Sequence, residues 1–118
     1  MQETIATTPD QFFECIDAYL DPADRLQVRK AFEFARQQHG DQIRKSGEPF
    51  FIHPLTVAYY LAEFHLDANA LSAALLHDVA EDVSVPIADI ERRFGREVAF
   101  LVDGVTKLKD VSIGVAKG

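Results

Sequence analysis

Proline and glycine divide this chain into segments of helical length, and the apolar residues inside those segments recur every three or four positions. Thr8-Pro9 and Asp21-Pro22 each join a capping residue to a proline that suits the first turn of a helix. No stretch alternates apolar and polar residues between hairpin turns, as paired strands would require. The sequence therefore predicts an all-α fold.

Six helices are expected from these signals. The first begins at Pro9, and the second begins at Pro22 and ends near Gly40. Residues 40 to 52 form an irregular stretch with no helical pattern. Four further helices are expected to begin, in order, at Pro54, after Asp67, at Pro86 and after Gly95.

The charge and length of the chain limit the classes of function. We expect one domain over residues 1–118, with residues 1–8 as a frayed leader. The net charge of −7 argues against a nucleic-acid-binding face, which needs an excess of cations, although a few local cations can still hold a small phosphorylated ligand. A helical DNA-binding domain is therefore disfavoured.

Cysteine content and hydropathy favour one cellular compartment over others. The single cysteine, Cys15, rules out an internal disulfide and a thiolate metal cluster. No apolar run is as long as a membrane span, and the N-terminus lacks the pattern of a signal peptide. We expect a cytoplasmic protein without a membrane partner.

Two histidines and an aspartate are expected to meet at one end of a helical hairpin. His53 starts the third helix and His77-Asp78 lies near the end of the fourth. Both helices have about 12 residues and a length of about 18 Å, and their short connection favours an antiparallel pair. Two imidazoles and a carboxylate suit Mn, Fe or Zn. The alternative is that each histidine is a hydrogen-bonded residue at a helix end.

Two more carboxylates follow this group. Glu81 is four residues after His77, and Asp82 is four residues after Asp78, so each pair shares a helix face. Carboxylates beside a metal-bound water can orient it or accept its proton. The alternative is a solvated acidic helix end, although an acidic last turn opposes the helix dipole.

The irregular stretch before His53 contains a small basic loop. Arg44, Lys45 and Ser46 precede Gly47, and a guanidinium can both bind phosphate and stack on a planar base. The loop is either a nucleotide-binding element or simply solvated. His39 and His65 lack carboxylates at ligand spacing and are interpreted as helix-end residues.

Several of these motifs occur together, and in the same order, in a known family. Residues 25 to 109 resemble the N-terminal hydrolase domain of the Rel/SpoT alarmone enzymes, a metal-dependent phosphohydrolase domain of the HD class. The matching motifs are Arg44-Lys45-Ser46-Gly47-Glu48-Pro49, Ile52-His53-Pro54-Leu55, Ala73-Ala74-Leu75-Leu76-His77-Asp78, Glu81-Asp82, Phe94-Gly95 and Asp103-Gly104-Val105-Thr106-Lys107-Leu108.

The resemblance implies hydrolysis of the 3′-diphosphate of (p)ppGpp to pyrophosphate and GDP or GTP, as part of the stringent response. It implies a Mn ion held by two histidines and two aspartates, of which His53, His77 and Asp78 supply three ligands. Glu81 and Asp82 correspond to the acidic pair of hydrolase-competent members.

The same resemblance assigns the basic loop to the substrate. Arg44, Lys45 and Ser46 correspond to a loop that holds the guanine nucleotide. Phe50 replaces a tyrosine that is frequent in relatives, which removes a possible hydroxyl contact.

One family motif, of the type Ala-Asp-Arg-Leu-His-Asn, does not occur before Gly118. The resemblance therefore implies a fourth ligand beyond Gly118 and an HD-domain helical bundle that is incomplete at its C-terminus. An incomplete bundle exposes apolar surface, which favours a homo-oligomer. The alternative function is a non-catalytic nucleotide-binding fragment of a bifunctional GTP pyrophosphokinase and (p)ppGpp hydrolase.

Overall fold

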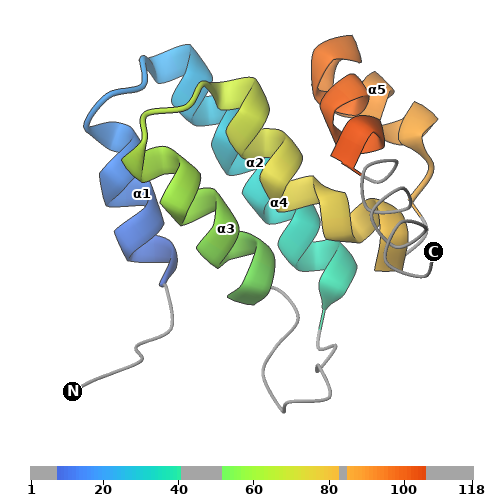
Figure 1. Cartoon of the computed structure of the whole chain (residues 1–118), viewed down its shortest axis with the longest axis horizontal. Coiled ribbons are helices and arrows are strands. Elements are labelled where there is room, and N and C mark those ends of the chain that lie inside the picture. Colours follow the sequence, from blue (N-terminus) through green and yellow to red (C-terminus); the bar gives the residue numbers. More distant parts are fainter. Residues whose placement is uncertain (1–7, 41–51, 83–84, 106–118) are drawn as a thin grey trace, which may run out of the picture.

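Helices make up nearly all of the part of the chain that the computed structural model describes. That part comprises residues 8–40, 52–82 and 85–105, with the side chains of residues 52, 53, 81 and 82 excluded. The helices are α1 (Pro9–Asp17), α2 (Pro22–His39), α3 (Ile52–Glu63), α4 (Ala68–Asp82) and α5 (Ile87–Phe94), and residues 96–105 are also helical (Figure 1). The prediction of an all-α fold is confirmed. None of the described helices is long and apolar enough to cross a lipid bilayer.

Capping side chains start three of the helices where the sequence predicted. The backbone N–H of Gln11 donates to Oγ1 of Thr8 at 3.2 Å, and the Gln11 side chain accepts from the Thr8 N–H at 2.9 Å. Asp21 accepts from the N–H of Asp24 at 2.9 Å. Asp67 accepts from the third residue of α4, also at 2.9 Å. Each bond satisfies a backbone donor that has no partner within its helix.

Two prolines lie at slightly different positions from those expected. α3 begins at Ile52, so Pro54 is its third residue rather than its first. Pro86 precedes α5 as its N-cap, and the helix begins at Ile87. Neither proline disturbs its helix, because the first turn of a helix does not use its backbone N–H groups internally.

The central helix of the bundle is α4, which packs against α2 on one side and α3 on the other, while α1 packs against α3. The middle of α4 is apolar on nearly every face, and such a helix is stable only when it is surrounded. Leu71, Leu75, Leu76 and Val79 are all fully buried. The core therefore lies along the length of α4.

A tight reversal joins α3 to α4. His65 has a φ angle of 60°, in the left-handed region, although glycine is the usual residue there. The N–H of Leu66 donates to the carbonyl oxygen of Leu61 at 3.3 Å, and the N–H of His65 donates to that of Ala62 at 2.9 Å. This pair of bonds is a Schellman motif, which ends α3 and turns the chain back.

Tyr19, just beyond α1, holds this reversal in place. Its ring stacks on that of His65, with the centroids 4.4 Å apart and the planes 10° apart. Its hydroxyl donates to the carbonyl oxygen of Leu66 at 2.6 Å. Burial, with smaller contributions from Cys15 and Asp67, raises the pKa of Tyr19 to about 12, which keeps the hydroxyl a donor.

We predict that Tyr19→Phe lowers the free energy of unfolding by about 1 kcal/mol, because it removes this hydrogen bond but keeps the stacked ring. The midpoint of thermal unfolding is expected to fall by about 5 °C. Tyr60→Phe is the matched control, since the Tyr60 side chain is largely exposed. Equal midpoints for the two variants would show that the bond to Leu66 contributes nothing.

Candidate functional site

Three helix ends meet at one edge of the bundle. α3 and α4 run antiparallel, so the start of α3 and the end of α4 lie at the same edge, together with the end of α2 (Figure 1). The predicted antiparallel hairpin is therefore confirmed for the backbone. It brings the first turn of α3, which contains His53, to the same edge as His77 and Asp78 on α4.

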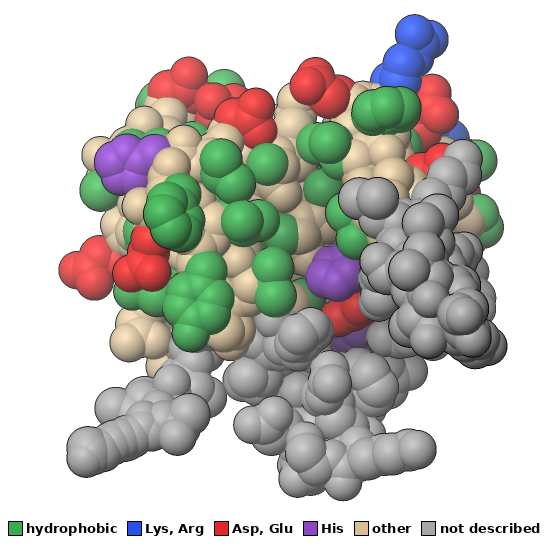
Figure 2. Space-filling model, viewed as in Figure 1, with side chains coloured by type: hydrophobic (Ala, Val, Ile, Leu, Met, Phe, Trp, Pro, Cys, Tyr) green, Lys and Arg blue, Asp and Glu red, His purple; other side chains and the backbone are tan. Residues whose placement is uncertain are grey.

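His77 and Asp78 form a close pair near the end of α4. The Nε2 atom of His77 lies 3.1 Å from Oδ1 of Asp78. Their side chains are only 12% and 7% exposed, so bulk water screens the pair weakly. Histidine and acidic side chains lie close together beside an apolar surface in Figure 2.

The other nitrogen of the His77 ring fixes the tautomer. Nδ1 lies 2.7 Å from the carbonyl oxygen of Ala74, which can only accept a hydrogen bond, so Nδ1 carries the proton. In the neutral ring, Nε2 is then a lone-pair donor that faces a carboxylate oxygen. A proton shared by these two atoms, or a metal ion bound to both of them, makes this arrangement favourable. Metal-binding histidines commonly donate their second N–H in the same way.

Asp78 carries a buried carboxylate. Its neighbours Leu75, Leu76 and Val79 on the same helix are buried apolar residues. A buried carboxylate is costly unless it is paired or bound to a metal ion. The pair of His77 and Asp78 therefore presents two adjacent metal donors, one nitrogen and one oxygen, in an apolar setting.

The remaining predicted ligand and acidic residues are located only by their backbone. His53 lies in the first turn of α3, and Glu81 and Asp82 end α4. Their side chains lie outside the described part. Among the side chains that the structure describes, no three His, Cys, Asp or Glu residues are grouped closely enough to hold a metal ion. The whole metal shell, including His77 and Asp78, remains a prediction.

The predicted nucleotide loop lies outside the described residues altogether. Arg44, Lys45 and Ser46 fall within residues 41–51. Their assignment to the substrate remains a prediction.

His39 is a residue whose burial the sequence analysis missed. It is the last residue of α2, as expected for a helix-end histidine, but it is only 1% exposed. Its place at the same edge of the bundle as His77 makes it a further candidate for the site. A signal was present in the sequence, because His39 continues the buried face of α2 formed by Val28, Phe32 and Ala35 at helical spacing.

An apolar groove of about 310 Å³ leads to His77. Its lining residues come from three helices: Val57 and Leu61 from α3, small alanines and His77 from α4, and Leu101 and Val105 from the helix of residues 96–105. His77 thus lies at the boundary between this apolar groove and the edge where the helix ends meet.

A family model described as "HD domain" matches residues 31–116. Among curated proteins, the chain is 49% identical over 87 residues to a guanosine-3′,5′-bis(diphosphate) 3′-pyrophosphohydrolase of Aquifex aeolicus, covering 74% of this chain and 12% of that protein. It is 46% identical over 95 residues to the protein of the same name from Borreliella burgdorferi, covering 80% and 14%. It is 51% identical over 89 residues to a probable GTP pyrophosphokinase of Mycobacterium leprae, covering 75% and 11%.

The chain therefore spans about one eighth of the length of these relatives, since the matched region covers 11–14% of each. The similarity that the sequence motifs suggested, to the HD domain of Rel/SpoT-type enzymes, is confirmed.

We predict that the His77 ring carries a proton on Nδ1 in the metal-free protein, because that atom faces a carbonyl oxygen. Long-range nitrogen–proton NMR spectra at about pH 8.5, well above the ordinary imidazole pKa of about 6.5, report the tautomer directly. His65, whose ring is exposed, provides the comparison within the same spectrum. A neutral His77 ring protonated only on Nε2 would contradict the assignment.

Proposed function

Because the chain belongs to the HD domain family, we propose that it is the hydrolase domain of a (p)ppGpp 3′-pyrophosphohydrolase. The reaction releases pyrophosphate and GDP or GTP in the metabolism of stringent-response alarmones, in the cytoplasm. The structural observation that supports this most directly is the 3.1 Å contact between His77 and Asp78, with Nδ1 of the imidazole facing the carbonyl oxygen of Ala74. We further propose that residues 1–118 form a single domain of this type.

The donor set fits a divalent transition metal. His77 offers a neutral imidazole nitrogen and Asp78 a carboxylate oxygen, which are the ligand types that Mn, Fe and Zn accept. We propose that His53, His77 and Asp78 hold a Mn ion, and that a fourth ligand lies beyond Gly118. The bound ion would lower the pKa of a water molecule and neutralise charge on the phosphate.

The residues of the chain itself have separate tasks in this proposal. The hydrogen bond to Ala74 fixes the orientation of the His77 ring, and the burial of Asp78 keeps bulk water away from its carboxylate. Glu81 and Asp82, one turn farther along α4, would orient the attacking water and accept its proton. This arrangement separates the groups that hold the ion from those that move the proton.

The substrate would be held on the side of the preceding loop. We propose that Arg44 and Lys45 bind the phosphates or stack on the guanine base, and that Ser46 adds a hydrogen bond. This assignment rests on the resemblance and on the position of the loop immediately before α3. The alternative is a chain that binds the nucleotide through this loop without turnover.

Exposed apolar side chains support a further protein contact. Phe64 is 81% exposed and Phe100 is 73% exposed, and large aromatic residues at the surface often mark interfaces. We propose that the 118-residue chain self-associates through its apolar surface.

We predict that Mn stabilises the wild-type chain and that His77→Ala and Asp78→Asn lose most of this effect. A ligand at about 100 times its dissociation constant adds about 2.7 kcal/mol to the stability of the native state. The measurement is the midpoint of thermal unfolding with and without Mn. Glu97→Gln is the control, because Glu97 is an exposed carboxylate on the helix of residues 96–105 and is not one of the proposed ligands. Equal Mn-induced shifts in all four proteins would rule out His77 and Asp78 as ligands.

We also predict that Glu81→Gln and Asp82→Asn lower (p)ppGpp hydrolysis about 100-fold or more while leaving the Mn-induced shift unchanged, because they affect proton transfer rather than metal binding. Pyrophosphate release is measured with added Mn, both in this chain and in one extended at the C-terminus. Glu97→Gln is the control, since Glu97 is exposed on the helix of residues 96–105.

Undiminished turnover in both site variants would identify the acidic pair as a solvated helix end. Nucleotide binding without turnover in the wild-type proteins would support the non-catalytic alternative.

A further inference from the structure

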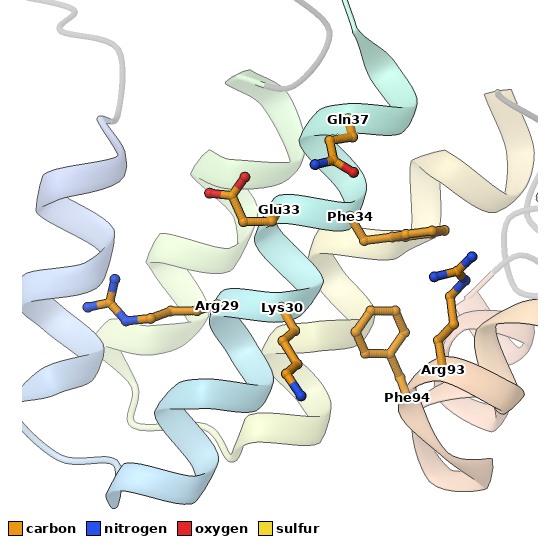
Figure 3. A pocket seen from close by; sticks show the side chains of 7 residues that line it. All are labelled: Arg29, Lys30, Glu33, Phe34, Gln37, Arg93 and Phe94. Carbon is orange, nitrogen blue, oxygen red and sulfur yellow. The ribbon is translucent and has the colours of Figure 1, made fainter.

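A second groove opens between α2 and α5, away from the candidate metal site. It has a volume of about 480 Å³, and none of its lining residues belongs to the proposed hydrolase site. Seen from the side on which it opens, α2 lies in front of α3 and α4 (Figure 3).

Two aromatic rings form the apolar part of the groove. Phe34 of α2 and Phe94 of α5 meet edge to face, with centroids 5.8 Å apart and planes 66° apart. The guanidinium carbon of Arg93 lies 4.7 Å from the centroid of the Phe34 ring, within range of a cation–π contact. Both rings are partly exposed, so they offer surface on which another planar group can pack.

Two basic side chains, Lys30 and Arg93, flank these rings. Within the part of the chain that the structure describes, neither Lys30 nor Arg93 makes an ion pair, and both are exposed. The carboxylate of the groove, Glu33, is already 2.8 Å from Arg36. The groove therefore combines three basic side chains and one acidic side chain, a positive excess in a chain of net charge −7.

The third basic residue of the groove, Arg29, makes its contacts with side chains of α1. Arg29 lies 3.2 Å from a carboxylate oxygen of Asp17 and 4.1 Å from the centroid of the Phe13 ring. Its side chain points toward α1, away from the two phenylalanines (Figure 3). Lys30 and Arg93 are therefore the cations that the groove offers to a ligand.

We propose that this groove binds a small planar aromatic anion. The phenylalanine rings supply a stacking surface, Lys30 and Arg93 supply charge for an anionic group, and the amide of Gln37 supplies a polar contact at the rim. The volume of about 480 Å³ lies within the range of small-molecule sites, about 300–1,000 Å³.

The test uses naphthalene-2-sulfonate as the probe, with 2-naphthol as its neutral analogue and sodium sulfate as the anion without a ring. Backbone amide spectra of the 118-residue chain are recorded during each titration. We expect saturable shifts of amide signals in α2 and α5 with the sulfonate, and at least tenfold weaker binding of either comparison compound, because each lacks one of the two contacts.

Three variants then test the assigned residues. Lys30→Gln and Arg93→Gln are each expected to weaken sulfonate binding roughly tenfold, because each removes a charge-assisted contact. Arg92→Gln is the matched control, since Arg92 is adjacent in sequence but pairs with Asp89 outside the groove. The same spectra show that each variant is folded.

Several results would overturn the proposal. They are sulfonate shifts confined to α3 and α4, equal binding of 2-naphthol, or equal losses in Arg92→Gln and Arg93→Gln. Binding of an acidic, phenylalanine-containing peptide in the absence of sulfonate binding would instead identify a protein-docking surface and would also refute it.

Discussion

The reversal at His65 is the constraint on which the arrangement of the bundle depends. Its left-handed backbone turns the chain so that α4 runs back along α3, and the ring of Tyr19 and its bond to Leu66 hold the turn against the end of α1. Because α3 has 12 residues and α4 has 15, a reversal that joins one pair of ends brings the start of α3 and the end of α4 to the same edge. The histidine and aspartate of α4 therefore reach the start of α3 as a consequence of a turn at the opposite end of the molecule.

Features that depend on neighbouring residues could be predicted from the sequence. The caps at Thr8, Asp21 and Asp67 all lie where the sequence placed them, because each side chain bonds to a backbone group three residues away. Proline is compatible with several positions in the first turn of a helix. Pro54 therefore indicates the region in which α3 begins but not its first residue, which is Ile52.

Features that depend on distant segments could not be predicted in the same way. The bond from Tyr19 to Leu66 joins residues 47 apart, and no local pattern indicates it. The apolar spacing of α2 places His39 on the buried face of that helix. Spacing alone does not show whether a residue at a helix end is covered, because that depends on the segments packed around it. For the candidate site, the contact between His77 and Asp78 and the 2.7 Å distance to Ala74 come from the structure, whereas the role of the two residues as metal ligands stays a prediction.

The unbroken course of α4 from the reversal to the site determines which changes in chain length the domain tolerates. One residue inserted between Ala68 and His77 would turn everything after it by about 100° and advance it by about 1.5 Å. The two donors would then face the core or a neighbouring helix, although every side chain of the site was still present in the sequence. An insertion in the short connection between α1 and α2 would leave that angular relation intact. In related sequences, insertions and deletions should therefore be absent from α4 even where its individual residues vary.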